Sequence, residues 1–330
     1  MLHGWIILDK PLGLGSTSAV SAVKRALREA GEPKTKVGHG GTLDPLATGV
    51  LPIALGEATK LAGRMLDATK AYEFTIRFGT QTDTLDLEGK AIATSDHRPT
   101  LAEVEAILPR FTGPIEQIPP AYSALKVDGE RAYDLARKGI DVELKTRSVT
   151  VHALEVKNPH PDLLPPAGEG EESVALPSPS PVLTGEGRGE GPSSLSSITL
   201  SASVSKGTYI RSLARDIAMA LGTVGHVTML RRTKAGPFSL STAISLDKLA
   251  DAAKARALTR MVLPLAAGLD DIPALPVTPD QARLLRHGQM LFGIPAKPGL
   301  SLATDGSTPV ALIESDGATI KVVRGFNLES

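Results

Sequence analysis

Runs of alternating and helically spaced apolar residues divide most of the chain into short strands and helices. The runs that alternate as strands are GWIILDK, AYEFTIRFG, VTVHALEV and SITLSASV. The runs with helical spacing cover residues 16–30, 103–108, 131–139 and 208–222, and Ser16, Thr17 or Ser18 can cap the first of them. Because helices and strands interleave without the regular spacing of βαβ units, the pattern predicts an α+β fold with a mixed or antiparallel sheet flanked by helices.

Residues 158–197 interrupt this pattern. They contain 8 Pro, 6 Gly and 7 Ser among 40 residues and no aromatic residue. Such a segment cannot bury enough apolar surface to offset the entropy lost on ordering. Because a predicted strand lies on each side of it, we expect a disordered Pro/Gly/Ser-rich insert at the tip of a long hairpin, within one domain that spans residues 1–271.

The character of the chain changes again after a Pro- and Asp-containing connector. Residues 272–330 hold one short helical run and three β-rich segments, SLATD, PVALIES and ATIKVV, separated by Gly turns. Short strands of this kind are typical of small closed β-structures. The pattern therefore predicts a second domain over residues 272–330, built as a small β-barrel.

Composition narrows the chemistry that the chain can perform. Hydrophobic residues make up 42% of it and charged residues 22%, which is ordinary for a globular protein. The absence of cysteine excludes disulfides, thiolate nucleophiles and Cys-ligated zinc. The seven histidines form no HxH or HxxxH pair, so we expect no metal ion. No apolar run approaches the roughly 18 residues of a membrane span, so we expect a cytoplasmic protein without a membrane partner.

The net charge of zero conceals a division along the chain. Residues 1–157 carry 20 basic and 20 acidic side chains, residues 158–197 carry 1 and 6, and residues 198–330 carry 15 and 10. Within the basic C-terminal third, a cluster opposes only Asp216; it consists of Lys206, Arg211, Arg215, Arg231, Arg232 and Lys234. Such a cluster either lines phosphates or forms a solvated helix face, and charge alone leaves both readings open.

Residues 37–56 place five glycines around one carboxylate, Asp44. Glycine permits tight turns and the close approach of a ligand, which favours a functional carboxylate. Alternatively, Asp44 caps a helix that begins at Pro45. The P-loop pattern GxxxxGK[ST] is absent, and the glycine run at residues 13–18 departs from GxGxxG at its last position, so we expect no nucleotide cofactor.

Two further segments carry candidate side chains. Residues 205–217, SKGTYIRSLARDI, present Arg211 on a predicted helix. Its guanidinium can keep a neighbouring carboxylate ionised or hold a phosphate, but it can equally pair with Asp216 or water at the surface. Tyr72, in the strand KAYEF, either packs in the core or serves a ligand.

Six motifs, taken together and in order, resemble the TruB family of bacterial tRNA pseudouridine-55 synthases. The motifs are LDKPLGLGSTS, KVGHGGTLDPLATGVLPIALGEATK, KAYEF with FGTQTDTLDLEG, IPPAYSALKVDGERAYDLARKG, SKGTYIRSLARD and GHVTMLRR. The resemblance as a whole extends over nearly all of residues 4–157 and 198–250. The resemblance implies a pseudouridine-synthase-type fold and isomerisation of a T-loop uridine, in which the N-glycosidic bond breaks and the base rejoins the sugar through C5.

The resemblance also implies a role for each matched side chain. Asp44 corresponds to the catalytic aspartate, which acts on the sugar as nucleophile or base. Arg211 corresponds to the arginine that pairs with it. Tyr72 corresponds to the tyrosine that stacks on the target base and helps to remove the C5 proton.

Four more matched residues are expected to bind the substrate or support the site. Tyr209 and Leu230 correspond to walls of the uracil pocket. His39 corresponds to the histidine that contacts the RNA loop from which the base is extruded. Lys10 belongs to a motif that supports the active-site loop.

The implied partner is the T-arm of tRNA, bound with the target uridine flipped out of its stack. We expect a stand-alone monomer that uses no guide RNA, no cofactor and no metal, with a PUA-like RNA-binding domain at residues 272–330. The acidic insert should weakly repel RNA, so its deletion should slightly raise tRNA affinity at low salt. Three alternatives remain: an RNA-binding protein or chaperone without turnover, a guide-RNA-dependent synthase and, last, a nucleotide-cofactor enzyme.

Overall fold

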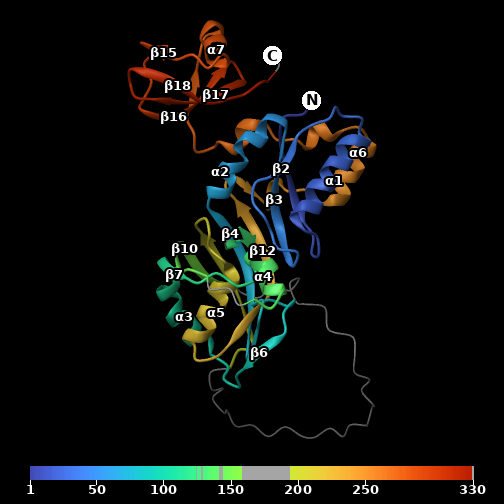
Figure 1. The fold of residues 1–330 in the computed structure, drawn as a ribbon, viewed down its shortest axis with the longest axis vertical. Coiled ribbons are helices and arrows are strands. Elements are labelled where there is room, and N and C mark those ends of the chain that lie inside the picture. The colour runs from blue at the N-terminus through green and yellow to red at the C-terminus, as the bar shows by residue number, and fades with distance from the viewer. Residues whose placement is uncertain (124, 128, 141–143, 158–193, 329–330) are drawn as a thin grey trace, which may run out of the picture.

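A nine-stranded mixed sheet forms the centre of the molecule (Figure 1). The computed structural model describes residues 1–123, 125–127, 129–140, 144–157 and 194–328. The main path of the sheet runs through β1 (Gly4–Lys10), β3 (Ala47–Leu55), β12 (Gly225–Ala235), β4 (Lys70–Phe78), β11 (Ser197–Val204), β10 (Arg147–Lys157) and β7 (Gly113–Gln117). β2 (Val37–His39) pairs with β3, and β13 (Phe238–Ser239) pairs with β12. Among the described strands of this sheet, β3 and β12 form the one parallel pair, which confirms the predicted α+β class with a mixed sheet.

Three helices of nine or more residues cover the central sheet, namely α1 (Ser16–Glu29), α5 (Ile210–Ala220) and α6 (Leu246–Lys254). α1 and α6 lie side by side over β1 and β3, and the apolar face of α1 packs in one core cluster with Leu51 and Leu249 (Figure 1). α5 packs on β4 and β11 in a second cluster, where Leu213 and Ile217 meet Phe74. These helices therefore build two separate core clusters on the sheet, and a third cluster packs on β1 and β3 with Trp5 and Val50.

Short elements complete the main body. The helices are α2 (Ala62–Asp67), α3 (Leu101–Ile107) and α4 (Ala132–Arg137). Two small ladders pair β5 (Thr80–Thr82) with β6 (Ala91–Thr94) and β8 (Lys126–Val127) with β9 (Glu130–Arg131). 3₁₀ turns occupy Gly56–Leu61, Leu108–Phe111, Leu240–Thr242, Leu258–Met261 and Leu265–Gly268. The helices expected at 103–108 and 131–139 are confirmed as α3 and α4. Within the described part of the chain, every helix is too short or too polar to cross a bilayer.

The predicted hairpin around the insert is confirmed where the structure describes it. β10 and β11 are antiparallel, with pairs from Val151 and Val204 to Lys157 and Thr199. The expected disorder falls on residues 158–193, which lie outside the described residues. The expectation that the insert extends to residue 197 is wrong, because Ser194 bridges to Thr100 and β11 begins at Ser197.

A separate five-stranded sheet follows near the C-terminus (Figure 1). Its order is β14 (Ala274–Pro276), β16 (Gly299–Asp305), β17 (Thr308–Ser315), β18 (Thr319–Gly325) and β15 (Leu291–Phe292), with α7 (Pro279–Arg286) beside it. The three predicted strands are confirmed, but β14 and β15 are not paired in the described residues, so the sheet is open where a closed barrel was expected. Phe326 packs with Trp5 and Leu269, which ties this sheet to the main body.

Candidate active site

Asp44 lies in the loop between β2 and β3. A turn at residues 45–46 follows it, and β3 begins at Ala47, whose N–H donates to the Asp44 carbonyl (3.0 Å). The alternative in which Asp44 caps a helix is therefore wrong. The tight turn leads directly into a buried strand, so the Asp44 side chain stays at the surface, where 51% of it is exposed.

Two side chains hold this loop from below. The N–H of Leu43 donates to Ser16 Oγ (2.8 Å), and the Ser16 hydroxyl donates to the Leu43 carbonyl (3.0 Å). Lys10 Nζ donates to the carbonyls of Pro45 (3.1 Å), Leu14 (2.7 Å) and Pro11 (3.1 Å). Lys10 is completely buried, and burial lowers its pKa to about 8 although Asp44 partly opposes the shift. Ser16 thus anchors the loop, and Gly15 occupies the N-cap position of α1 that was expected for a serine or threonine.

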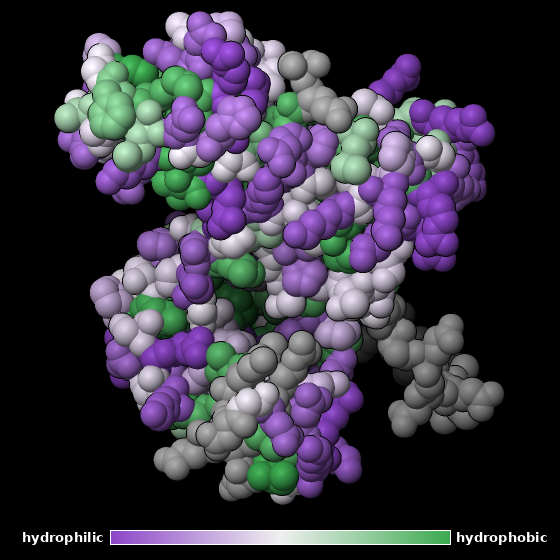
Figure 2. All heavy atoms as spheres, turned by 45° about the horizontal axis from the view of Figure 1, so that its top comes forward, coloured by the Kyte–Doolittle hydropathy of each residue, from purple (hydrophilic) through white to green (hydrophobic). Residues whose placement is uncertain are grey.

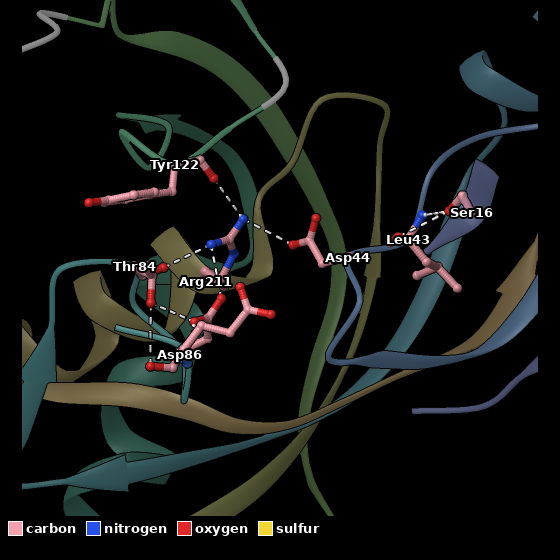
Figure 3. A network of polar contacts seen from close by, with 8 residues as sticks. Ser16, Leu43, Asp44, Thr84, Asp86, Tyr122 and Arg211 are labelled. Atoms are coloured by element: carbon pink, nitrogen blue, oxygen red, sulfur yellow. Dashed lines mark hydrogen bonds and ion pairs between the residues drawn. The ribbon is translucent and has the colours of Figure 1, made fainter. Parts of the chain in front are cut away.

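Arg211 reaches Asp44 from the first turn of α5 (Figure 3). Its Nη2 lies 3.0 Å from Asp44 Oδ2 and donates to the Tyr122 carbonyl (3.0 Å). Its Nη1 donates to Asp86 Oδ2 (3.0 Å) and to the Thr84 carbonyl (2.8 Å). Four acceptors therefore fix a guanidinium that is 8% exposed, and Asp44 is the one exposed member of the group.

Asp86 was not singled out from the sequence. It is buried, and its Oδ1 accepts hydrogen bonds from the Thr84 hydroxyl (2.5 Å) and the Glu88 N–H (3.0 Å). The signal was present in the motif FGTQTDTLDLEG, but an aspartate in a polar turn is more often a turn residue than an ion-pair partner. In the structure it orients Arg211 toward Asp44.

A cavity of about 310 Å³ opens beside the Asp44–Arg211 pair. Five of the seven predicted site residues line it: Asp44, Tyr72, Tyr209, Arg211 and Leu230. Tyr72 and Leu230 pack against both core clusters, so the cavity lies where the two cores meet. The parallel pairing of β3 with β12 sets Leu230 opposite Ala47, which brings it to the start of the strand that follows Asp44. Figure 2 shows the surface hollowed near the middle of the molecule, with hydrophobic side chains at the bottom.

Tyr209 is held at the N-terminus of α5. Its N–H donates to Gln117 Oε1 (2.7 Å), and the Gln117 amide donates back to its carbonyl (3.1 Å). Burial raises the pKa of the Tyr209 phenol, so the ring enters the cavity neutral.

His39 and Lys10 are not on the walls of this cavity. His39 lies at the end of β2, and its Nδ1 is buried without a hydrogen-bond partner in the described residues. Burial and the nearby Arg232 charge both lower its pKa. Lys10 lies under the loop, where it supports the backbone around Asp44.

The basic cluster expected at residues 206–234 is mostly neutralised. Asp216 pairs with the adjacent Arg215. The other partners come from distant segments: Arg211 pairs with Asp44 and Asp86, Arg231 with Asp9, and Lys206 with Asp67. The expectation of a cluster opposed only by Asp216 is therefore wrong, because folding brings four further aspartates to it. Among the described ion pairs, Arg232 and Lys234 have no carboxylate partner.

No three His, Asp or Glu side chains gather as a metal-binding group in the described part of the chain. The arrangement instead offers an exposed carboxylate that an immobilised arginine holds against an aromatic and aliphatic cavity. A carboxylate held in this way can act as a nucleophile or a base toward a flat ring bound beside it.

Comparisons with known proteins identify the family of this chain. The family model for the N-terminal domain of TruB family pseudouridylate synthase matches residues 24–164, and the model for the tRNA pseudouridylate synthase B C-terminal domain matches residues 211–270. A tRNA pseudouridine synthase B of Novosphingobium aromaticivorans is 58% identical, over 100% of this chain and 99% of its own. That of Zymomonas mobilis is 55% identical, over 99% and 96%.

Solved structures share the fold. A Cbf5-Nop10-Gar1 complex contains a chain that is 25% identical with a TM-score of 0.68, covering 98% of this chain and 85% of that one. An H/ACA RNP bound to a substrate RNA containing 2'-deoxyuridine contains one that is 24% identical with a TM-score of 0.66, covering 99% and 86%. Two relatives are more than 50% identical to this chain over nearly its whole length, and the two TruB family models match it in order. The chain belongs to the TruB family of pseudouridylate synthases.

Proposed function

We propose that this protein isomerises uridine-55 in the T-loop of tRNA to pseudouridine, as a stand-alone enzyme without guide RNA or cofactor. The observation that carries the proposal is the 3.0 Å contact between Asp44 and Arg211 at the mouth of a cavity that Tyr72 and Leu230 also line. We infer tRNA as the substrate because the relatives that match this chain along nearly its whole length are named tRNA pseudouridine synthase B.

Asp44 is the nucleophile or base of the reaction. Its Oδ2 lies 3.0 Å from Arg211 Nη2, and this contact orients the carboxylate for either role. It attacks C1' of the ribose, or removes a proton from C2', as the bond from C1' to N1 of uracil breaks. The freed uracil then turns, and its C5 bonds to C1' as the Asp44 carboxylate leaves C1' or, on the second route, returns its proton to C2'. The proton lost from C5 is balanced by one gained at N1, so the reaction is an isomerisation.

The cavity suits a uracil ring that has left its stack. Tyr72 supplies an aromatic face and Leu230 an aliphatic one, and stacking of this kind offsets the few kcal/mol that flipping a base costs. Tyr209 closes the wall next to Arg211. Tyr72 also lies near the base and is the residue we assign to assist removal of the C5 proton.

The remaining contacts concern the rest of the RNA. We assign His39 to the loop left behind by the flipped base, and Lys10 to support of the Asp44 loop. We further propose that the C-terminal sheet is a PUA-like RNA-binding unit over residues 272–330, that residues 1–271 form the catalytic domain, and that the enzyme acts as a cytoplasmic monomer on the T-arm.

The test is tritium release from C5 of uridine in unmodified tRNA transcripts, with the protein alone. We expect release by the wild type, mapped to uridine-55, and a loss of at least about 1,000-fold in Asp44→Asn with tRNA binding retained. The matched control is Asp216→Asn, on an aspartate outside the cavity that pairs with Arg215.

Each other outcome removes part of the proposal. Wild-type activity in Asp44→Asn would end the assignment of Asp44. Binding without release by the wild-type protein would favour an RNA chaperone, and release only after addition of a guide RNA would favour a guide-dependent synthase.

A further inference from the structure

Arg232 is a buried cation without a carboxylate partner in the described residues. It is 1% exposed, its Nε donates to the Val50 carbonyl (2.7 Å) and its Nη1 donates to the Thr42 carbonyl (3.1 Å). Its Nη2 is buried with no hydrogen-bond partner, although Arg232 lines the same cavity as Asp44. An arginine cannot release its proton, so this charge stays in the protein and must be balanced by something else.

Two lysines lie on the same part of the cavity wall. Tyr72 pairs with Arg232 across β4 and β12, so their side chains share a face of the sheet. Lys70 precedes Tyr72 by two residues and therefore points to that face as well. Lys206 follows β11, whose Val204 pairs with Lys70, and it also lines the cavity.

Lys70 has little to neutralise it. It is 8% exposed, and its Nζ donates to the Leu66 and Ala68 carbonyls, both at 2.6 Å, which leaves one of three N–H donors without a partner among the described contacts. Burial and then the Arg232 charge lower its pKa to about 8. An anion bound beside Lys70 would raise its pKa again, because a nearby negative charge stabilises the protonated amine.

Lys206 is the accessible member of the three. Its side chain is 65% exposed and pairs with Asp67 at 2.5 Å, an ion pair at the surface that contributes little and can be exchanged for another anion. Together the three residues bring three positive charges to one wall of the cavity, and the exposed carboxylate of Asp67 is the ion-pair partner of one of them.

We propose that Lys70, Lys206 and Arg232 form a phosphate subsite that binds a backbone phosphodiester directly flanking the target uridine. Lys206 and the free donor of Lys70 make the contacts, and Arg232 contributes its charge from behind them. The subsite rests on the proposed function, because its ligand belongs to the same RNA strand as the base in the cavity. It acts as a positioning site: with the phosphate held, the sugar is fixed against Asp44.

The test removes the charge from each partner in turn. T-arm hairpins carry one methylphosphonate, either 5' or 3' of the target uridine, and are bound by protein in an Asp44→Asn background so that no turnover occurs. Lys70→Met and Lys206→Met are compared with Lys254→Met, an exposed lysine on α6. Lys206→Met keeps the test decisive even if Lys70→Met fails to fold.

We expect one methylphosphonate position to weaken binding to the parent protein by about 5- to 10-fold, and to weaken binding to Lys70→Met or Lys206→Met clearly less, because each variant has already lost one of the two contacts. The slope of log affinity against log salt should fall by about 0.7 in each of these variants and stay unchanged in Lys254→Met. Additive losses at both flanking positions in both variants would overturn the subsite.

Tritium release by the protein with Asp44 intact, on the unmodified hairpin, separates the two proposals. Release together with additive losses refutes the subsite and leaves the proposed function standing. Absence of release refutes the proposed function itself.

Discussion

Arg211 and Arg232 line the same cavity and are both nearly buried, yet their surroundings differ. Arg211 meets two carboxylates and two backbone carbonyls, whereas Arg232 meets two carbonyls and, in the described residues, no carboxylate. The first arginine is neutralised by the protein and serves to fix Asp44. The second keeps its charge uncompensated. The difference teaches that one cavity can hold two arginines with separate tasks. Arg211 fixes the carboxylate that we assign to the chemistry, and Arg232 keeps a charge that suits the proposed anionic ligand.

The largest effect expected within this comparison comes from Asp86→Asn. Arg211 pairs with two carboxylates, and the change removes the charge of the buried one. Arg211 is then less well oriented toward Asp44. We expect kcat for pseudouridine formation to fall by about 100-fold and the free energy of unfolding to fall by about 3 kcal/mol.

Single-turnover kinetics and urea unfolding measure the two quantities. Asp216→Asn, which removes the ion pair with Arg215 within α5, should keep kcat and lower the free energy of unfolding by less than about 1 kcal/mol. If kcat of Asp86→Asn equals that of the wild type, Asp86 has no part in orienting Arg211.

The next prediction tests whether β12, which carries Arg232, must approach β3 closely. Gly49 has a φ of +99°, and a Cβ there would lie 2.2 Å from the Arg232 carbonyl oxygen. We expect Gly49→Ala to lower the free energy of unfolding by about 3 kcal/mol because β3 and β12 must separate. Gly63→Ala, on the exposed side of α2 with no atom near the new methyl group, should instead raise it by up to about 1 kcal/mol. Equal urea midpoints for the two variants would contradict this account.

The smallest effect concerns the pH dependence of stability that comes from Lys70 in the cavity wall. Between pH 8 and 10.5 the unfolded chain keeps a proton on Lys70 that the folded protein has released, because the folded pKa is about 8. Unfolding therefore takes up a proton, and stability contributed by this residue rises with pH in that window. Lys70→Met should reduce the slope of unfolding free energy against pH by about 1 kcal/mol per unit near pH 9, and Lys10 should retain a similar contribution. Urea unfolding at pH 8.5 and 9.5 checks this, and identical slopes in the two proteins would rule it out.

Local pattern predicted the elements of the fold but, apart from the β10–β11 hairpin, did not predict which strands lie side by side. The alternation of AYEFTIRFG and the spacing of residues 208–222 correspond to β4 and α5. By contrast, the parallel contact of β3 with β12 joins segments far apart in the chain, and no local pattern specifies such a pairing. The C-terminal strands were likewise predictable, whereas the open edge between β14 and β15 depends on twist and packing.

The site divides in the same way. Asp44 and Arg211 each had an ordinary alternative when considered alone, and only the resemblance of ordered motifs joined them. Arg231 and Arg232 were grouped in one basic cluster, although successive residues of a strand point to opposite faces. That alternation would have separated Arg231, which pairs with Asp9, from the buried Arg232.

The hairpin of β10 and β11 also makes the enzyme open to engineering. Its described ladder ends with Lys157 beside Thr199, so backbone hydrogen bonds fix the distance between two chain ends whatever sequence joins them. A guest domain whose own termini lie close together can be spliced between these strands without changing their register. The hairpin is thus an attachment point for a fluorescent reporter, with which the proposed binding of RNA on the same sheet could be followed in real time.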